Sequence, residues 1–265
     1  MSSEPHVISE VSGGVGTVTL NRPEKMNAFF GSMRDEIADA LEEMAEREDV
    51  RVVIVTGRGR AFCTGADVGY MADLLDREAY DEANALVTAG RRVIGAITSM
   101  PKPVIGSVNG PAAGGGANMA LACDLRIASD RASIGQTFNR IGLHPDWGGT
   151  WLLPRLVGRA RAAELFFFGE MIGAEDAARI GLFNRVVPHD ELAATTRDWA
   201  ERLVAKPALP LALAKRAIRI SDGSSLEEML DYEADAQDSC FRSDDAMEGT
   251  RAFVEKRAPN FGAGR

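Results

Sequence analysis

The sequence predicts an α/β fold in which a core of alternating strands and helices is followed by a region of helices alone. Short β-branched runs alternate with helical patterns up to about residue 188, and the pattern from 190 onward is almost entirely helical. Apolar residues make up 45% of the 265-residue chain and charged residues 26%, a balance that supports a packed core. We expect the core to span 1–195 and a helical C-terminal region to span 196–265, with the change somewhere in 190–205.

Each predicted element follows from a local pattern. Short β-branched or alternating runs predict strands at Val15–Leu20, 52–55, Val104–Val108, 125–128 and Arg185–Val187. Apolar residues at helical spacing predict helices at 31–47, 79–98, 117–123 and 160–168. Near the end of the chain, Leu226, Met229, Leu230 and Phe241 need burial, so the last helices form either a surface bundle or an oligomerisation element.

Composition narrows the classes of partner. There are 30 basic and 39 acidic residues, so the formal net charge is −9, which disfavours nucleic acid and anionic membranes as partners. Cys63, Cys123 and Cys240 are widely spaced and form no CxxC pair, which is typical of a reduced, cytoplasmic protein. The N-terminus lacks a signal-peptide pattern, no run of 18 apolar residues predicts a membrane span, and three scattered histidines predict no metal site.

Two segments rich in small residues follow predicted strands. The first, 61–68, contains Thr64-Gly65-Ala66, where small side chains let a ligand approach the backbone. The second, 109–116, ends in three glycines and leads into a helix, whose first N–H groups point at one place. A dinucleotide fingerprint is excluded because Met119 stands where its last glycine belongs; the P-loop and GxSxG patterns are also absent.

Five motifs together resemble the crotonase (enoyl-CoA hydratase/isomerase) family. They are NRPEKMNAF, GRAFCTGADV, KPVIGSVNGPAAGGG, GLHPDWGGT and EGTRAFVEKRAPNF, in the family's order and spacing over nearly the whole chain. The resemblance implies a spiral of β-β-α units with a helical C-terminal trimerisation region. It implies an acyl-CoA thioester as substrate and no separate cofactor, because coenzyme A is part of the substrate. It also implies a homotrimer or a dimer of trimers.

The resemblance assigns an oxyanion hole to the backbone N–H groups of Ala66 and Gly115. Removing an α-proton from a thioester places charge on its oxygen, and one prepositioned donor is typically worth about 3 kcal/mol. The positions implied to contact coenzyme A are Lys25, Ala61, Gly65, Asp67, Val68, Gly114, Phe253 and Lys256. Phe253 and Lys256 match positions that a neighbouring subunit often supplies, Lys25 alone would be an ordinary solvated lysine, and we expect Asp67 mainly to hold its turn.

The sequence departs from the hydratase pattern at both glutamates. Family hydratases hold a water between two glutamates, and here those positions are Asn118 and Phe138. Adding water across a double bond needs a base for the water and an acid for the α-carbon. Neither side chain does this, so we expect hydration to be absent or very weak.

Asp146 is the carboxylate best placed to replace them. It lies in His144-Pro145-Asp146-Trp147, in a loop that faces the acyl group in the family, and burial near an aromatic side chain would raise its pKa. The alternative is that Asp146 only caps the helix that follows. His144 is either its partner or a structural hydrogen bonder.

Two branches of the family place an aspartate at this position. Residues 142–162 are similar to enoyl-CoA isomerases of the phenylacetate-degradation type, in which one carboxylate suffices for a 1,3-proton shift. The 4-chlorobenzoyl-CoA dehalogenases also need a histidine from the preceding helix, and 86–98 contain none. We therefore favour an isomerase over a residual hydratase, a dehalogenase, or a non-catalytic acyl-CoA binding protein.

Overall fold

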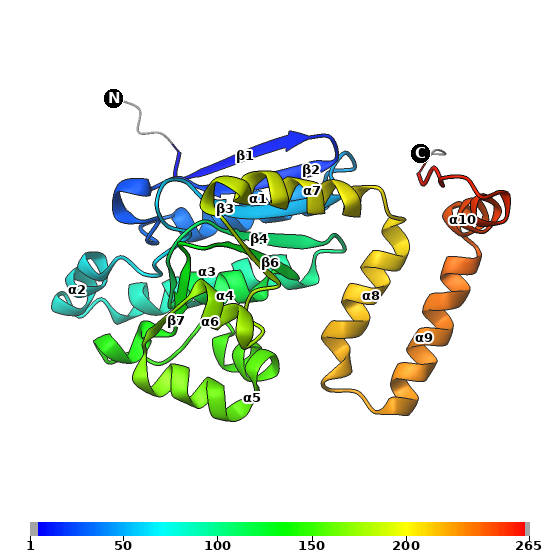
Figure 1. Cartoon of the computed structure of the whole chain (residues 1–265). Helices are drawn as coiled ribbons and strands as arrows, with labels where there is room; N and C mark the ends of the chain where they lie inside the picture. The colour runs from blue at the N-terminus through cyan, green and yellow to red at the C-terminus, as the bar shows by residue number, and fades with distance from the viewer. Residues whose placement is uncertain (1–4, 263–265) are drawn as a thin grey trace.

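A six-stranded sheet forms the centre of the computed structural model, which describes residues 5–262 (Figure 1). The order is β1-β2-β3-β4-β6-β9; β1 and β2 are antiparallel and the other neighbours are parallel. These strands are Val7–Ser12, Val15–Leu20, Val52–Gly57, Val104–Val108, Leu125–Ser129 and Arg185–Val187. A smaller sheet contains β5 (Ala112–Ala113), β7 (Ser133–Gly135) and β8 (Met171–Gly173).

Alternate residues of the large sheet face two different layers of helices. Val53 and Val55 belong to the main core with α1, α3 and α4, whereas Val52 and Ile54 pack with Leu192 and Ala200 of α7. The core helices are α1 (Met33–Glu46), α2 (Val68–Asp76), α3 (Tyr80–Ser99), α4 (Gly115–Ala122), α5 (Gly149–Phe168), α6 (Ala174–Arg179) and α7 (Leu192–Val204). Short 3₁₀ turns η1, η2 and η3 span Pro23–Lys25, Thr137–Ile141 and His189–Glu191. Parallel strands buried on both faces explain the continuous apolar runs in the sequence.

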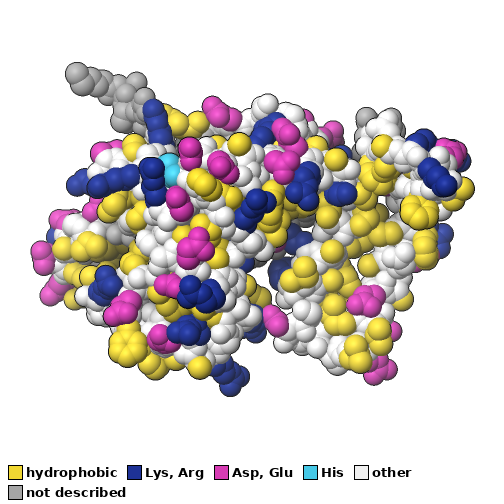
Figure 2. Space-filling model, viewed as in Figure 1, with side chains coloured by type: hydrophobic (Ala, Val, Ile, Leu, Met, Phe, Trp, Pro, Cys, Tyr) yellow, Lys and Arg dark blue, Asp and Glu magenta, His cyan; other side chains and the backbone are white. Residues whose placement is uncertain are grey.

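The last three helices form an arm that extends away from the sheet (Figure 1). They are α8 (Ala208–Ser221), α9 (Leu226–Phe241) and α10 (Asp244–Glu255). The predicted boundary after residue 195 falls inside α7, which packs on the sheet, so the arm begins at α8. Hydrophobic side chains gather on the surface of this arm (Figure 2); those exposed are Ile218, Leu226, Leu230, Phe241, Met247, Phe253 and Val254.

One partly buried ion pair fixes the base of the arm to the core. Lys215 of α8 lies 2.7 Å from Asp124 and also donates to the carbonyls of Ile97 and Lys102 at 2.9 and 3.0 Å. All three N–H donors of the Lys215 ammonium therefore have acceptors, which offsets the cost of removing this charge from water.

Among residues 5–262, every helix is too short or too polar to cross a membrane.

The predicted strands and the first helices are confirmed, whereas several short elements were missed. β1, the three strands of the small sheet and α2 had no prediction. One helix begins earlier than expected: α4 starts at Gly115 rather than 117, because glycine is a poor helix former and indicates a loop in a sequence. The predicted helix 160–168 is the part of α5 that follows a break at Gly158, and the helix expected to follow Asp146 is the part before it.

Candidate active site

Two chain segments lie side by side where β3 and β4 end, at the carboxyl edge of the parallel sheet. Residues 62–63 pair with 111–113: the N–H groups of Phe62 and Cys63 donate to Pro111 O at 3.1 and 3.2 Å, and that of Ala113 to Cys63 O at 3.0 Å. A Cβ on Gly116 would lie 2.2 Å from Cys63 O, so only glycine allows this approach. Clefts at this edge of parallel sheets commonly bind ligands.

The N–H groups of Ala66 and Gly115 are both left free at this junction. The residues on either side of Ala66 form backbone hydrogen bonds with Phe29: Gly65 O accepts from Phe29 N–H at 2.7 Å, and Asp67 N–H donates to Phe29 O at 3.1 Å. Within residues 5–262, Ala66 and Gly115 donate no backbone hydrogen bond. Gly65 has φ +81°, and a Cβ there would lie 3.4 Å from Gly115 N, which places the two turns close together. Two free donors are thus available to one oxyanion.

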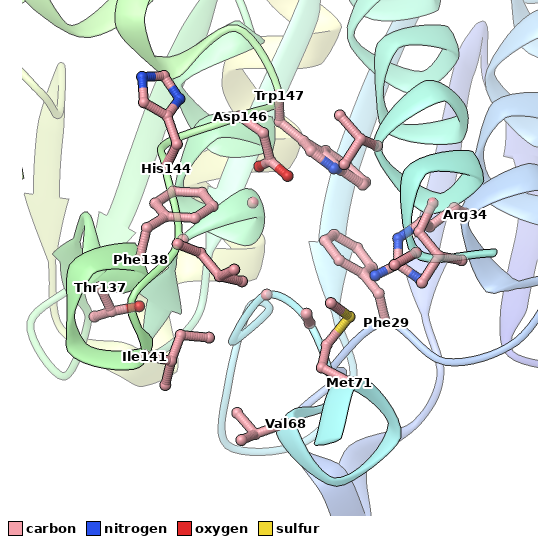
Figure 3. Close-up of a pocket in the computed structure, with 18 of the residues that line it drawn as sticks. Phe29, Arg34, Val68, Met71, Thr137, Phe138, Ile141, His144, Asp146 and Trp147 are labelled. Carbon is pink, nitrogen blue, oxygen red and sulfur yellow. The ribbon is translucent and has the colours of Figure 1, made fainter. Parts of the chain in front are cut away.

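These turns open into a cavity of about 670 Å³ (Figure 3). Most of its wall is apolar. The apolar side chains come from α2, α3, η2 and the loop before α5: Val68, Met71, Leu75, Leu86, Val87, Phe138, Ile141, Leu143 and Trp147. Phe29 stacks on Trp147 with ring centres 4.4 Å apart, and Gly90 of α3 makes room for the indole. An apolar cavity with few polar groups is typical of a small-molecule site.

Among residues 5–262, Asp146 is the single acidic residue in the cavity wall, and Figure 3 shows its carboxylate pointing into the cavity. Its Oδ1 atom is buried and has no hydrogen-bond partner among residues 5–262. Burial raises the pKa of the Asp146 carboxyl to about 6, against the opposing effect of the Arg34 charge. The capping alternative is wrong: the N-cap of α5 is Gly148, and no side chain caps that helix. A carboxylate with this pKa is suited to accept a proton near neutral pH.

Asn118 holds the loop that carries Asp146. Its side-chain N–H donates to Asp146 O at 2.8 Å, and its Oδ1 accepts from Gln136 at 2.8 Å. Asn118 is fully buried and does not line the cavity, whereas Phe138 contributes its ring to the wall. Both positions that would carry glutamate in a hydratase therefore have structural roles here.

The sequence matches the model of the family described as Enoyl-CoA hydratase/isomerase over residues 10–264. The chain belongs to the enoyl-CoA hydratase/isomerase family. It is 39% identical to the 1,2-epoxyphenylacetyl-CoA isomerase of Escherichia coli, over 96% of this chain and 97% of that one. It is 43% identical to a probable enoyl-CoA hydratase of Rhodobacter capsulatus, over 95% and 96%. Relatives of both names are thus similar to this chain.

Solved structures of the family have the same fold. A putative enoyl-CoA hydratase/isomerase from Mycobacterium abscessus superposes with a TM-score of 0.93 at 32% identity, covering 98% of this chain and 100% of that one. An enoyl-CoA hydratase from Bacillus anthracis gives 0.92 at 34%, covering 97% and 99%. The crotonase-like α/β fold predicted from the motifs, with its helical C-terminal region, is confirmed.

The predicted coenzyme A positions divide into four groups in this family member. Gly65, Val68 and Gly114 line the cavity with Ala66 and Gly115. Lys25 is exposed in η1, just before Met26, whose carbonyl accepts from the N–H of the cavity residue Thr64 at 3.2 Å. Phe253 lies on α10 and Lys256 is the C-cap residue of that helix, in the arm (Figure 1). Neither residue lines the cavity.

Ala61 and Asp67 support the site from behind its wall. Ala61 is fully buried, and its carbonyl accepts from Asn27 at 2.8 Å and Asn109 at 3.1 Å. Asp67 caps α2 through the N–H groups of Gly69 and Tyr70 and pairs with Arg22 at 2.8 Å. Partial burial would raise the pKa of Asp67, but the bond from Arg22 and the two cap bonds hold it below its ordinary value. Asp67 therefore holds its turn, as expected.

Two further site residues could not be predicted from the sequence. Phe29 and Arg34 both line the cavity, one before α1 and the other in its first turn. Arg34 lies within a segment whose apolar residues recur at helical spacing, and it looked like one of the polar residues between them. A buried arginine in a region of charged residues has no sequence signal of its own.

Proposed function

We propose that this family member is an enoyl-CoA isomerase that converts a 3-enoyl-CoA into a 2-enoyl-CoA, with Asp146 as the single acid–base group. The thioester oxygen accepts hydrogen bonds from the N–H groups of Ala66 and Gly115. Asp146 removes a proton from C2, the electron pair is delocalised onto the thioester oxygen, and the protonated carboxyl returns the proton to C4. The reaction consumes nothing else, so it needs no cofactor beyond the coenzyme A of the substrate.

The observation that carries this proposal is the buried Oδ1 atom of Asp146, which has no hydrogen-bond partner among residues 5–262, in a mainly apolar cavity. Its raised pKa of about 6 suits a group that must both take and return a proton. The similarity to an enzyme named an isomerase also supports it. A silent acyl-CoA binder would have no need for a desolvated carboxylate, whose burial costs free energy.

Hydration is the second candidate, because relatives at 39% and 43% identity are named crotonyl-CoA hydratase and probable enoyl-CoA hydratase. Asn118 and Phe138 disfavour it, since Asp146 alone would have to activate the water and protonate the carbon. We expect at most slow hydration of crotonyl-CoA.

The test is turnover of 3-hexenoyl-CoA and crotonyl-CoA by the purified protein, with products identified by mass spectrometry. We expect rapid formation of 2-hexenoyl-CoA, and a loss of at least about 100-fold in kcat for Asp146→Asn. Asp176→Asn, an exposed aspartate on α6, is the matched control and should retain full activity. Faster hydration than isomerisation, or unchanged turnover in Asp146→Asn, would contradict the proposal.

The arm supports a homotrimer or a dimer of trimers. Its exposed apolar side chains include Ile218, Leu230 and Phe253, with exposed fractions of 74%, 54% and 85%. Side chains of this size are normally covered, and contact with neighbouring copies would cover them and bring Phe253 and Lys256 to another copy's nucleotide-binding surface. Light scattering should give three or six times the chain mass, and Ile218→Ser with Leu230→Ser should lower it. A monomer at micromolar concentration would contradict this proposal.

A further inference from the structure

Arg34 is a buried cation without a hydrogen-bonding partner. Its exposed fraction is 3%, and its Nε and Nη1 atoms are buried and donate no hydrogen bond among residues 5–262. It forms no ion pair within 4 Å among residues 5–262, although the Asp146 charge acts on it at longer range. The Phe29 ring lies 5.2 Å from its guanidinium carbon. Buried arginines in folded proteins are normally paired, because an unsatisfied charged group is costly.

The Asp146 charge favours the charged form of Arg34, but burial opposes it more strongly and lowers the pKa of the guanidinium. Arg34 is the second residue of α1, and the positive end of a helix dipole disfavours a cation there. Arginine does not lose its proton in proteins, so neutralisation offers no escape. The free energy lost at this position therefore points to an acceptor that the folded chain does not itself supply.

The cavity is where such an acceptor would lie. Arg34 and Asp146 both line it, and the groups around them are mainly aromatic or aliphatic (Figure 3). The other basic lining residues, Arg140 and His144, are exposed to solvent. A plain hydrocarbon acyl chain would fill the cavity but leave the guanidinium unpaired.

We propose that the acyl group of the natural substrate carries a second oxygen, beyond the thioester carbonyl, that accepts hydrogen bonds from Arg34. The substrate class is an oxygenated acyl-CoA, with a ketone, hydroxyl, ring oxygen or carboxylate on the part of the chain that enters the cavity. This inference rests on the proposed use of the cavity for the acyl group, and it deepens that function by naming what distinguishes the preferred acyl group.

Binding of saturated acyl-CoA esters tests this without any isomerisation. Titration calorimetry would compare hexanoyl-CoA with 5-oxohexanoyl-CoA, 6-hydroxyhexanoyl-CoA and adipoyl-CoA, and phenylacetyl-CoA with its three ring-hydroxylated isomers. A hydrogen bond to a charged group should make at least one oxygenated ester bind about 10- to 100-fold more tightly than its parent. The series also identifies which kind of oxygen is recognised, and the coenzyme A contribution cancels within each pair.

Substitution of Arg34 completes the test. Arg34→Met keeps most of the volume and removes the donors, so we expect the preference to disappear, while Arg34→Lys should retain part of it. Because the ratio is measured within one variant, a general loss of affinity does not imitate the result, and thermal unfolding reports whether the variant folds. The proposal is overturned if wild-type protein binds every parent ester as tightly as its oxygenated partners, or if Arg34→Met keeps the preference. These outcomes do not depend on whether the enzyme isomerises 3-enoyl-CoA.

Discussion

The two sides of the Asp146 loop handle their polar groups in opposite ways. On the α4 side, Asn118 is fully buried and uses its side-chain N–H and oxygen in hydrogen bonds at 2.8 Å. On the cavity side, the carboxylate of Asp146 is only partly buried, yet its Oδ1 has no partner. A buried polar group with its hydrogen bonds made adds rigidity. A buried polar group without a partner costs free energy in the folded state and remains available to a substrate. The difference separates the residue that holds the loop from the carboxylate that we propose acts in the reaction.

Placing an unsatisfied carboxylate on both sides of the loop, by Asn118→Asp, should have the largest effect on stability. Asn118→Asp removes the donor to Asp146 O and places a second buried carboxylate beside the loop. We expect the free energy of unfolding in urea to fall by about 3 kcal/mol, with a parallel loss of isomerase activity. Gln237→Glu, the same change at an exposed position of α9, should alter neither. A stable Asn118→Asp protein would show that the hydrogen bond to the loop is dispensable.

The substitution Asp146→Asn should have a smaller effect, and it should raise the free energy of unfolding rather than lower it. The folded pKa of Asp146, about 6, is above the ordinary value of 3.8, so the folded state binds a proton more tightly than the unfolded state. Its ionisation therefore reduces stability as pH rises from about 4 to 6, and the cost is complete at pH 7. Asp146→Asn removes that cost. We expect the free energy of unfolding of this variant, measured in urea at pH 7, to be about 1 kcal/mol higher than that of the wild type. Equal or lower stability would mean that the carboxylate has a stabilising partner.

The smallest predicted effect is a shift in the pH profile. Because Asp146 must be ionised to accept a proton, kcat/KM should rise through a pKa of about 6 and then level off. The Arg34 charge lowers this pKa, as a protonated His144 does more weakly. In Arg34→Met the rising limb should therefore move to higher pH. A limb that moves to lower pH, or a flat profile, would remove Asp146 from the role of base.

Much of the fold was predictable because strand and helix patterns are local. Val15–Leu20 and Val104–Val108 match their strands residue for residue, and the motifs placed Ala66, Gly115 and Asp146 in one cavity. The partners of Asn118 were not predictable, because Gln136 and the Asp146 carbonyl reach it only through the tertiary fold. The sequence showed what Asn118 lacks as a catalyst, and only the structure shows what it binds.

Arg34 and the arm illustrate the same limit in physical terms. Whether a charged side chain is solvated or buried depends on what packs over it, and Phe29 covers Arg34 from outside the helix. In the arm, apolar residues at helical spacing predicted burial, but Leu226 and Phe241 remain 77% and 72% exposed in the single chain. Periodicity predicts which face of a helix is apolar, and it says nothing about whether the same chain or another copy covers that face.

The Asn118 amide has a consequence for how this site can change over generations. A glutamate at position 118 would place a hydrogen-bond acceptor, in place of the Asn118 donor, directly against the Asp146 carbonyl. The loop would then lose this support, and one glutamate alone would not yet supply the pair that holds a water. A glutamate at position 138 alone would put a second negative charge into the cavity that Asp146 lines. Each single step toward a two-glutamate site therefore passes through a damaged intermediate. A change to a two-glutamate site would therefore require several substitutions together.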